Sequence, residues 1–149
     1  MNRRVLLVED VLDKADKIKK CVKRAFPDLD IADCTSYHSA LKEIFENHSQ
    51  YSLVLLDMSM STYDQNVEEF GGVPEAMAGK RILEGIFLRE INTKVIVVTM
   101  YEHFGGEGIK QLDKEFRIDY ADNYIGYVFF SFNKTDWQRQ LIDLMRQVL

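Results

Sequence analysis

Short apolar runs alternate with segments of helical spacing along the whole 149-residue chain. The apolar runs are rich in Val, Ile and Leu, which is typical of strands buried on both faces, and they cover residues 4–8, 29–32, 51–56, 94–98 and 126–130. The intervening segments repeat apolar residues every three or four positions, which predicts helices, over residues 12–26, 36–47, 77–90, 108–116 and 135–148. Strands and helices in alternation form right-handed crossovers around a parallel sheet. We therefore expect a doubly wound α/β fold with five parallel strands and helices on both faces.

Length and composition predict one globular domain over residues 1–149. An apolar share of 46% and a charged share of 29% are ordinary for a chain with a packed core. Two connections exceed the usual length of about 2–6 residues, and we expect an expanded loop around 59–76 and a smaller expansion around 102–122. The first loop is either a lid or partner surface beside a site, or a tolerated surface insertion.

The charge pattern excludes several classes of partner. A net charge of −5 without a concentrated basic face argues against direct nucleic-acid binding. Apolar runs fall well short of the roughly 20 residues of a membrane helix, and the first residues do not form a secretory signal. The two cysteines, Cys21 and Cys34, lack metal-ligand or redox spacing and predict plain thiols. We expect a cytoplasmic protein that does not enter a membrane.

Acidic residues follow two of the predicted strands. Glu9 and Asp10 follow the first strand, and Asp57 follows the third. In open α/β sheets ligands bind outside the carboxyl ends of the strands where the strand order reverses. For the order 2-1-3-4-5 this point lies between the first and third strands, so the three carboxylates converge there and suit a divalent cation. Thr99, at the end of the fourth strand, faces the same crevice with a hydroxyl group.

Each acidic residue also has a purely structural interpretation. Asp10 can cap the first helix and Asp57 can begin a loop, because Asp favours both positions. The functional interpretation depends on their combination at the strand ends.

Three segments carry a resemblance to a known family. VLLVED, LVLLDMSM and VIVVTM resemble the strand ends of the receiver domain of bacterial response regulators, and the order of elements matches over nearly the whole chain. The resemblance implies a flavodoxin-like receiver fold. It also implies that Glu9, Asp10 and Asp57 hold Mg²⁺, with the backbone carbonyl of Ser59 as a further ligand. Asp57 would be the phosphoacceptor, supplied by a histidine kinase or phosphotransfer protein.

The same resemblance assigns signalling roles. Thr99 would hydrogen-bond the phosphoryl group, and Tyr127 occupies the position of the switch aromatic. The protein would be a signalling receiver in a two-component system or phosphorelay rather than an enzyme, catalysing at most its own phosphorylation and dephosphorylation. Receivers often dimerise through their last elements, so a homodimer is among the assemblies that the resemblance allows, and the downstream partner is not identified.

The chain departs from the family at the fifth strand. Receivers carry a Lys three residues after the switch aromatic, where its ammonium pairs with the phosphate. Aligning Tyr127 as the aromatic places Phe130 at that position, and Lys134 is the nearby substitute if the strand shifts its register. Met100 also follows Thr99, where the family has a small residue. These departures keep a second function open: a degenerate pseudo-receiver that acts as a phosphorylation-independent protein-interaction module.

Two helices carry distinctive side chains. The first helix contains a basic run, which normally forms a solvated face, although receivers also dock their histidine-bearing partner on this helix. The run comprises Lys14, Lys17, Lys19, Lys20, Lys23 and Arg24. Trp137, Leu141 and Met145 lie at helical spacing in the last helix and predict core positions.

Overall fold

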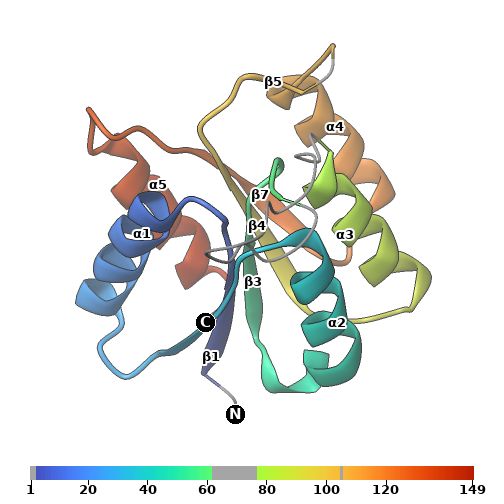
Figure 1. Ribbon diagram of the computed structural model, residues 1–149, viewed down its shortest axis with the longest axis horizontal. Coiled ribbons are helices and arrows are strands. Elements are labelled where there is room, and N and C mark those ends of the chain that lie inside the picture. The colour runs from blue at the N-terminus through green and yellow to red at the C-terminus, as the bar shows by residue number, and fades with distance from the viewer. Residues whose placement is uncertain (1–2, 62–76, 105) are drawn as a thin grey trace, which may run out of the picture.

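Five parallel strands form one sheet, in the order β2-β1-β3-β4-β7 (Figure 1). The computed structural model describes residues 3–61, 77–104 and 106–149. The strands of this sheet are β1 Arg4–Val8, β2 Asp30–Cys34, β3 Leu53–Leu56, β4 Lys94–Thr99 and β7 Tyr124–Phe129. The helices are α1 Leu12–Ala25, α2 Tyr37–Asn47, α3 Ala78–Leu88, α4 Ile109–Asp119 and α5 Asp136–Arg146, with a short 3₁₀ turn, η1, at His48–Gln50. The predicted α/β class, strand order and parallel sheet are confirmed.

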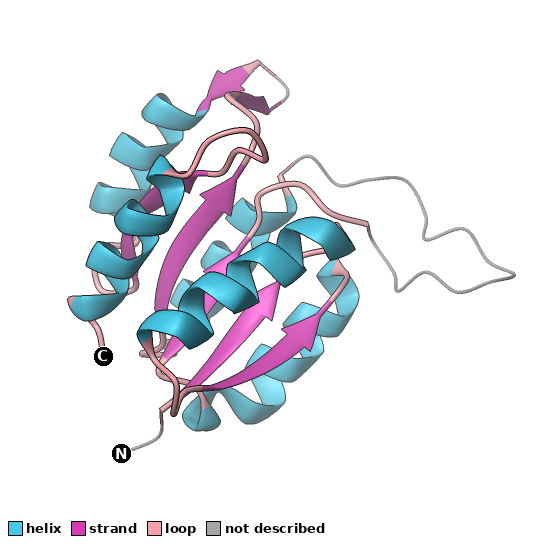
Figure 2. Cartoon of the chain, turned by 90° about the vertical axis from the view of Figure 1, so that its left-hand side faces the viewer, coloured by secondary structure: helices cyan, strands magenta, loops and turns pink. Residues whose placement is uncertain are grey.

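Helices cover both faces of the sheet (Figures 1 and 2). One apolar cluster joins α1 and α5 to the sheet, and a second joins α2, α3 and α4 to the opposite face. Successive residues of a strand point to opposite faces: Val5 and Leu7 of β1 belong to the α1/α5 cluster, whereas Leu6 and Val8 belong to the other. This double burial is the reason that Val5–Val8 of β1 and Leu53–Leu56 of β3 are apolar throughout rather than alternating.

Local signals explain where the connections turn. Ser36 caps α2 through a reciprocal capping box with Ser39, which satisfies backbone donors that the first helical turn leaves unpaired.

The predicted core positions Trp137, Leu141 and Met145 are buried between α5 and the sheet.

A two-stranded antiparallel hairpin lies between β4 and α4. It pairs β5, His103–Phe104, with β6, Glu107–Gly108, within the predicted expansion at 102–122. Gly106 has a φ of 94° in its turn, a conformation that other residues adopt only with strain. The sequence analysis did not predict these strands, because two-residue strands are too short to show a period.

The longer predicted loop, at 59–76, lies largely outside the described residues, which end at Ser61 and resume at Met77. No helix in the described part of the chain is long and apolar enough to cross a membrane.

Candidate functional site

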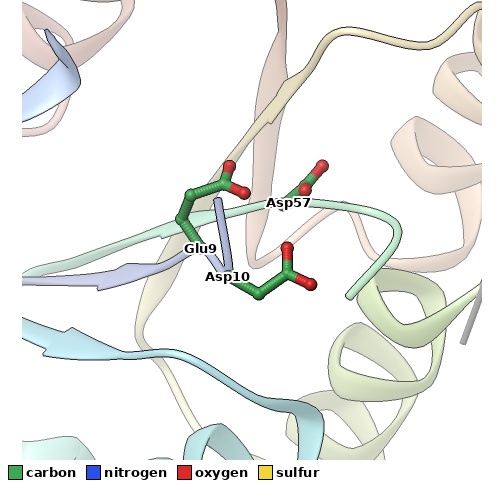
Figure 3. Close-up of side chains that lie close together, drawn as sticks. All are labelled: Glu9, Asp10 and Asp57. Atoms are coloured by element: carbon green, nitrogen blue, oxygen red, sulfur yellow. The ribbon is translucent and has the colours of Figure 1, made fainter. Parts of the chain in front are cut away.

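The three predicted carboxylates meet at the ends of β1 and β3. One side-chain oxygen from each of Glu9, Asp10 and Asp57 lies within 4.8 Å of the others (Figure 3). The register explains the convergence, because Val8 pairs with Leu56 and both strands then end at the same level. Backbone hydrogen bonds continue this alignment: Asp57 N–H donates to Val8 O at 3.1 Å, and Glu9 N–H donates to Cys34 O at 3.0 Å.

Neighbouring loops fix the orientation of the acidic pair. Val11 N–H donates to Glu9 Oε2 at 3.2 Å, which turns the Glu9 carboxylate over the start of α1. Asp10 Oδ2 accepts two hydrogen bonds from Ser61, from the backbone N–H at 3.0 Å and from the hydroxyl at 3.2 Å. Asp10 therefore ties the start of α1 to the loop that follows β3. This contact adds Ser61 to the site.

The loop that follows β3 and starts at Asp57 is held by a close approach of α3. Met58 N–H donates to Asp57 Oδ1 at 2.8 Å, and Gly79 N–H donates to Met58 O at 3.0 Å. A Cβ atom at position 79 would lie 2.8 Å from Asp57 O and 2.9 Å from the Met58 Cα. Only glycine fits here without movement of the Asp57 backbone.

A lysine from α1 enters the acidic cluster. Lys14 is fully buried, and its Nζ lies 2.5 Å from Glu9 Oε1 and 3.3 Å from Asp57 Oδ1. The same ammonium donates a hydrogen bond to Val98 O at 2.8 Å. The expectation that the basic run forms a solvated face is therefore wrong for Lys14. Helical spacing places Lys14 on one stripe with Ile18 and Cys21, which are also buried.

Burial perturbs the acidity of two carboxyl groups. Burial, followed by repulsion from Asp57, raises the pKa of Glu9 to about 8, against the opposing effect of Lys14. Burial also raises the pKa of Asp57, again opposed by the Lys14 ammonium. In both groups burial outweighs the stabilisation of the charged form by the Lys14 ammonium.

Thr99 is the last residue of β4, the strand that pairs with β3, and its hydroxyl as a phosphoryl ligand stays a prediction. Its side chain is buried, and its Oγ1 accepts a hydrogen bond from Tyr101 N–H at 3.3 Å, a contact that leaves the hydroxyl proton for another acceptor. The preceding residue, Val98, supplies the carbonyl that holds Lys14. The end of β4 thus positions both a hydroxyl and an ammonium group.

The end of β7 presents aromatic side chains. Phe130 is 1% exposed; its ring centroid lies 4.7 Å from that of Trp137 and 5.8 Å from Lys14 Nζ. Tyr127 is half-buried on β7 and pairs with Val97. It lines a hollow of about 400 Å³ together with His103, Ile109 and Phe129.

The remaining residues that the sequence singled out are Lys134, Ser59 and Met100. Lys134 is exposed and lines a surface hollow with Lys17 and Arg24, while Lys14 is the lysine that contacts Asp57. Ser59 is half-buried, two residues after Asp57, and its carbonyl as a metal ligand stays a prediction. Met100 is half-buried and packs against the α1/α5 cluster.

The donor set fits a hard divalent cation. All three acidic residues offer oxygen, the ligand that Mg²⁺ prefers. Glu9 Oε1 is buried and lies 2.5 Å from Lys14 Nζ, while burial and then repulsion from Asp57 raise the pKa of Glu9 to about 8. A cation held by these three residues would offset the repulsion between their carboxylates.

Comparison with known proteins identifies a curated relative. No protein-family model matches the chain. The Detocs response regulatory protein DtcB of Enterobacter cloacae is 26% identical over 144 residues, covering 93% of this chain and 95% of its own.

Solved structures share the fold. The signal receiver domain of a putative LuxO repressor protein from Vibrio parahaemolyticus matches 99% of this chain and 91% of its own, with a TM-score of 0.63 and 21% identity. The CheX–CheY complex with BeF₃ and Mg²⁺ from Borrelia burgdorferi matches 97% of this chain and 87% of its own, with a TM-score of 0.68 and 16% identity. The chain has the receiver fold of response regulators.

Proposed function

We propose that this chain is a receiver that accepts a phosphoryl group on Asp57 from a histidine kinase or phosphotransfer protein, with Mg²⁺ as cofactor. The observation that carries the proposal is the convergence of Glu9, Asp10 and Asp57 within 4.8 Å at the switch point of the sheet. Two comparisons support it: the relative DtcB is named a response regulatory protein, and a neighbour of the same fold is described with Mg²⁺ and a beryllofluoride group.

The chemistry of transfer follows from the position of Asp57. One carboxylate oxygen of Asp57 forms a new P–O bond while the P–N bond of a phosphohistidine breaks on the opposite side. The imidazole nitrogen keeps the electron pair, and Asp57 becomes an acyl phosphate. Mg²⁺ held by Glu9, Asp10, Asp57 and the carbonyl of Ser59 would neutralise charge and align this in-line transfer. The hydrogen bond from Met58 N–H and the contact with α3 keep the nucleophile in place.

The signal would be read at the end of β4. The Thr99 hydroxyl would donate a hydrogen bond to the phosphoryl group, pulling the β4 end toward Asp57. Tyr127 lies on the adjacent strand and borders the hollow beside the hairpin and α4, so a shift of β4 would change its surroundings. We propose this as the route from phosphorylation to a downstream protein partner, in a cytoplasmic signalling protein rather than an enzyme.

A second candidate function is a pseudo-receiver that binds partners without phosphorylation. Two observations favour it. Phe130 stands where receivers carry a Lys, and the Lys14 ammonium already lies between Glu9 and Asp57. In that function Lys14 would take the place of the metal.

The deciding experiment is incubation with acetyl phosphate and Mg²⁺, followed by intact mass spectrometry. We expect the mass of one phosphoryl group to be added to the wild type. The added mass should be absent when Mg²⁺ is left out of the labelling reaction, and absent from Asp57→Asn. Asp33→Asn is the matched control, because Asp33 is a half-exposed carboxylate on neighbouring β2 and its variant should be labelled like the wild type. Absence of labelling, together with absence of beryllofluoride binding, would overturn the proposal in favour of the pseudo-receiver.

A further inference from the structure

We infer that Lys14, from α1, supplies the ammonium that stabilises a phosphoryl group on Asp57, in place of the lysine that receivers carry at the end of the last strand. The inference rests on the proposed function and assigns a role that no sequence pattern gives to this position.

The position of the ammonium carries the inference. Lys14 Nζ lies 3.3 Å from Asp57 Oδ1 and is held at the end of β4 by Val98 O at 2.8 Å. Val98 directly precedes Thr99, so the Lys14 ammonium is held at the end of β4, next to the residue that carries the hydroxyl group. A group attached to the Asp57 carboxylate would lie beside this ammonium, which is the charge that a phosphoryl group with its excess negative charge requires.

Stability does not explain this lysine. A lysine is almost never fully buried unless it is paired, and replacing a buried ion pair with apolar residues is often neutral or stabilising. Lys14 also lies in the first turn of α1, where the helix dipole disfavours a positive charge. The carboxylates of Glu9 and Asp57 hold the Lys14 ammonium there against the cost of burying a charge and against the helix dipole.

Phe130 occupies the position at the end of the last strand where receivers carry a lysine. Its ring is buried against Trp137 and belongs to the α1/α5 cluster, so the strand end fills apolar space rather than presenting a charge. The ring lies 5.8 Å from Lys14 Nζ, within range of a cation–π contact. The ammonium of the site therefore comes from the first helix of the chain rather than from the end of its last strand.

The test compares Lys14→Met and Lys14→Gln with the wild type. Both variants remove the charge, and Gln keeps a donor for Val98 O in case the apolar variant does not fold. Lys17→Met is the matched control, since Lys17 is an exposed lysine of the same helix. Folding is checked by circular dichroism, and three quantities follow: Mg²⁺ affinity by calorimetry, affinity for beryllofluoride with saturating Mg²⁺, and phosphoryl uptake from acetyl phosphate.

We expect the Lys14 variants to change Mg²⁺ affinity in one direction, and beryllofluoride affinity and phosphoryl uptake in the other. Mg²⁺ should bind more tightly, because a neighbouring positive charge is gone. Beryllofluoride should bind about tenfold more weakly or worse, the loss expected for one charge-assisted hydrogen bond, and phosphoryl uptake should fall with it. Introducing Phe130→Lys into Lys14→Met should recover part of the beryllofluoride affinity, since it returns an ammonium from the strand end.

The outcomes distinguish this inference from the proposed function. Unchanged or tighter beryllofluoride binding by the Lys14 variants, with normal binding by the wild type, overturns the inference alone and makes Lys14 a competitor of the metal. Failure of wild type and Lys17→Met to bind beryllofluoride or take up phosphate overturns the proposed function and this inference together.

Discussion

The site has two halves of different origin. The acid half, Glu9, Asp10 and Asp57, comes from residues that directly follow two paired strands, and its geometry is set by strand register. The donor half joins Thr99 at the end of β4 to Lys14 from α1, with Phe130 filling the space at the end of β7. Carboxylates at strand ends are therefore positioned by the sheet itself, whereas a cation can come from any element that packs over the sheet.

Truncation of Phe130 gives the largest expected effect on the donor half. Phe130→Ala should lower the free energy of unfolding by about 3–5 kcal/mol, because it leaves a cavity in the core against Trp137. Urea denaturation measures the change. Phe129→Ala is the control, since Phe129 is 39% exposed and should lose far less. Equal losses would show that Phe130 is not a core residue.

A methyl group at Gly79 tests the support of the acid half. Gly79→Ala should destabilise the fold by about 1–3 kcal/mol, because the new Cβ meets backbone atoms of Asp57 and Met58. Thermal unfolding measures the effect. Gly85→Ala lies in the same helix but meets the end of the Phe45 ring, which can move, and it should cost less. A larger loss of stability for Gly85→Ala than for Gly79→Ala would contradict the close approach of α3 to the loop that starts at Asp57.

Neutralising one carboxylate tests the acid half directly. Asp10→Asn should weaken Mg²⁺ binding by about tenfold or more, equivalent to about 1.4 kcal/mol, because an amide oxygen carries no net charge. Calorimetry measures the affinity, with Asp33→Asn as the control on β2. If Mg²⁺ binds Asp10→Asn as tightly as the wild type, the cation site lies elsewhere.

Removal of divalent cations should expose a pH dependence. The pKa of Glu9 is raised to about 8 from 4.5 in the unfolded chain, by burial and then by repulsion from Asp57. The folded state then holds a proton that the unfolded state has released, so stability falls as pH rises from about 5 to about 8, by at most about 1.4 kcal/mol per pH unit for this group.

Chemical denaturation in EDTA at several pH values measures this slope. Glu9→Gln should flatten it, whereas Glu46→Gln, an exposed acid of α2, should not. Mg²⁺ should oppose the decline, because it favours the deprotonated carboxylate. Stability that rises with pH over the same interval in EDTA would contradict the raised pKa of Glu9.

Sequence patterns predicted most of the architecture from particular residues. Val5 to Val8 and Leu53 to Leu56 are apolar without alternation, which is possible only for strands covered on both faces, and this predicted the parallel sheet with helices on each side. The order 2-1-3-4-5 then predicts that Glu9, Asp10 and Asp57 lie together at the strand ends. The hairpin at residues 103–108 could not be predicted, because two paired residues on each strand carry no period.

Lys14 marks the boundary between sequence and tertiary structure. In the structure Lys14 shares the buried stripe of α1 with Ile18 and Cys21, whereas the basic run to which it belongs predicted a solvated face. The sequence by itself determined the sheet and the acid half, because burial and register are periodic and local. Only the tertiary structure decided which cation faces Asp57. That choice depends on how the first turn of α1 packs over the end of β4, and a contact between positions 14 and 98 leaves no trace in local spacing.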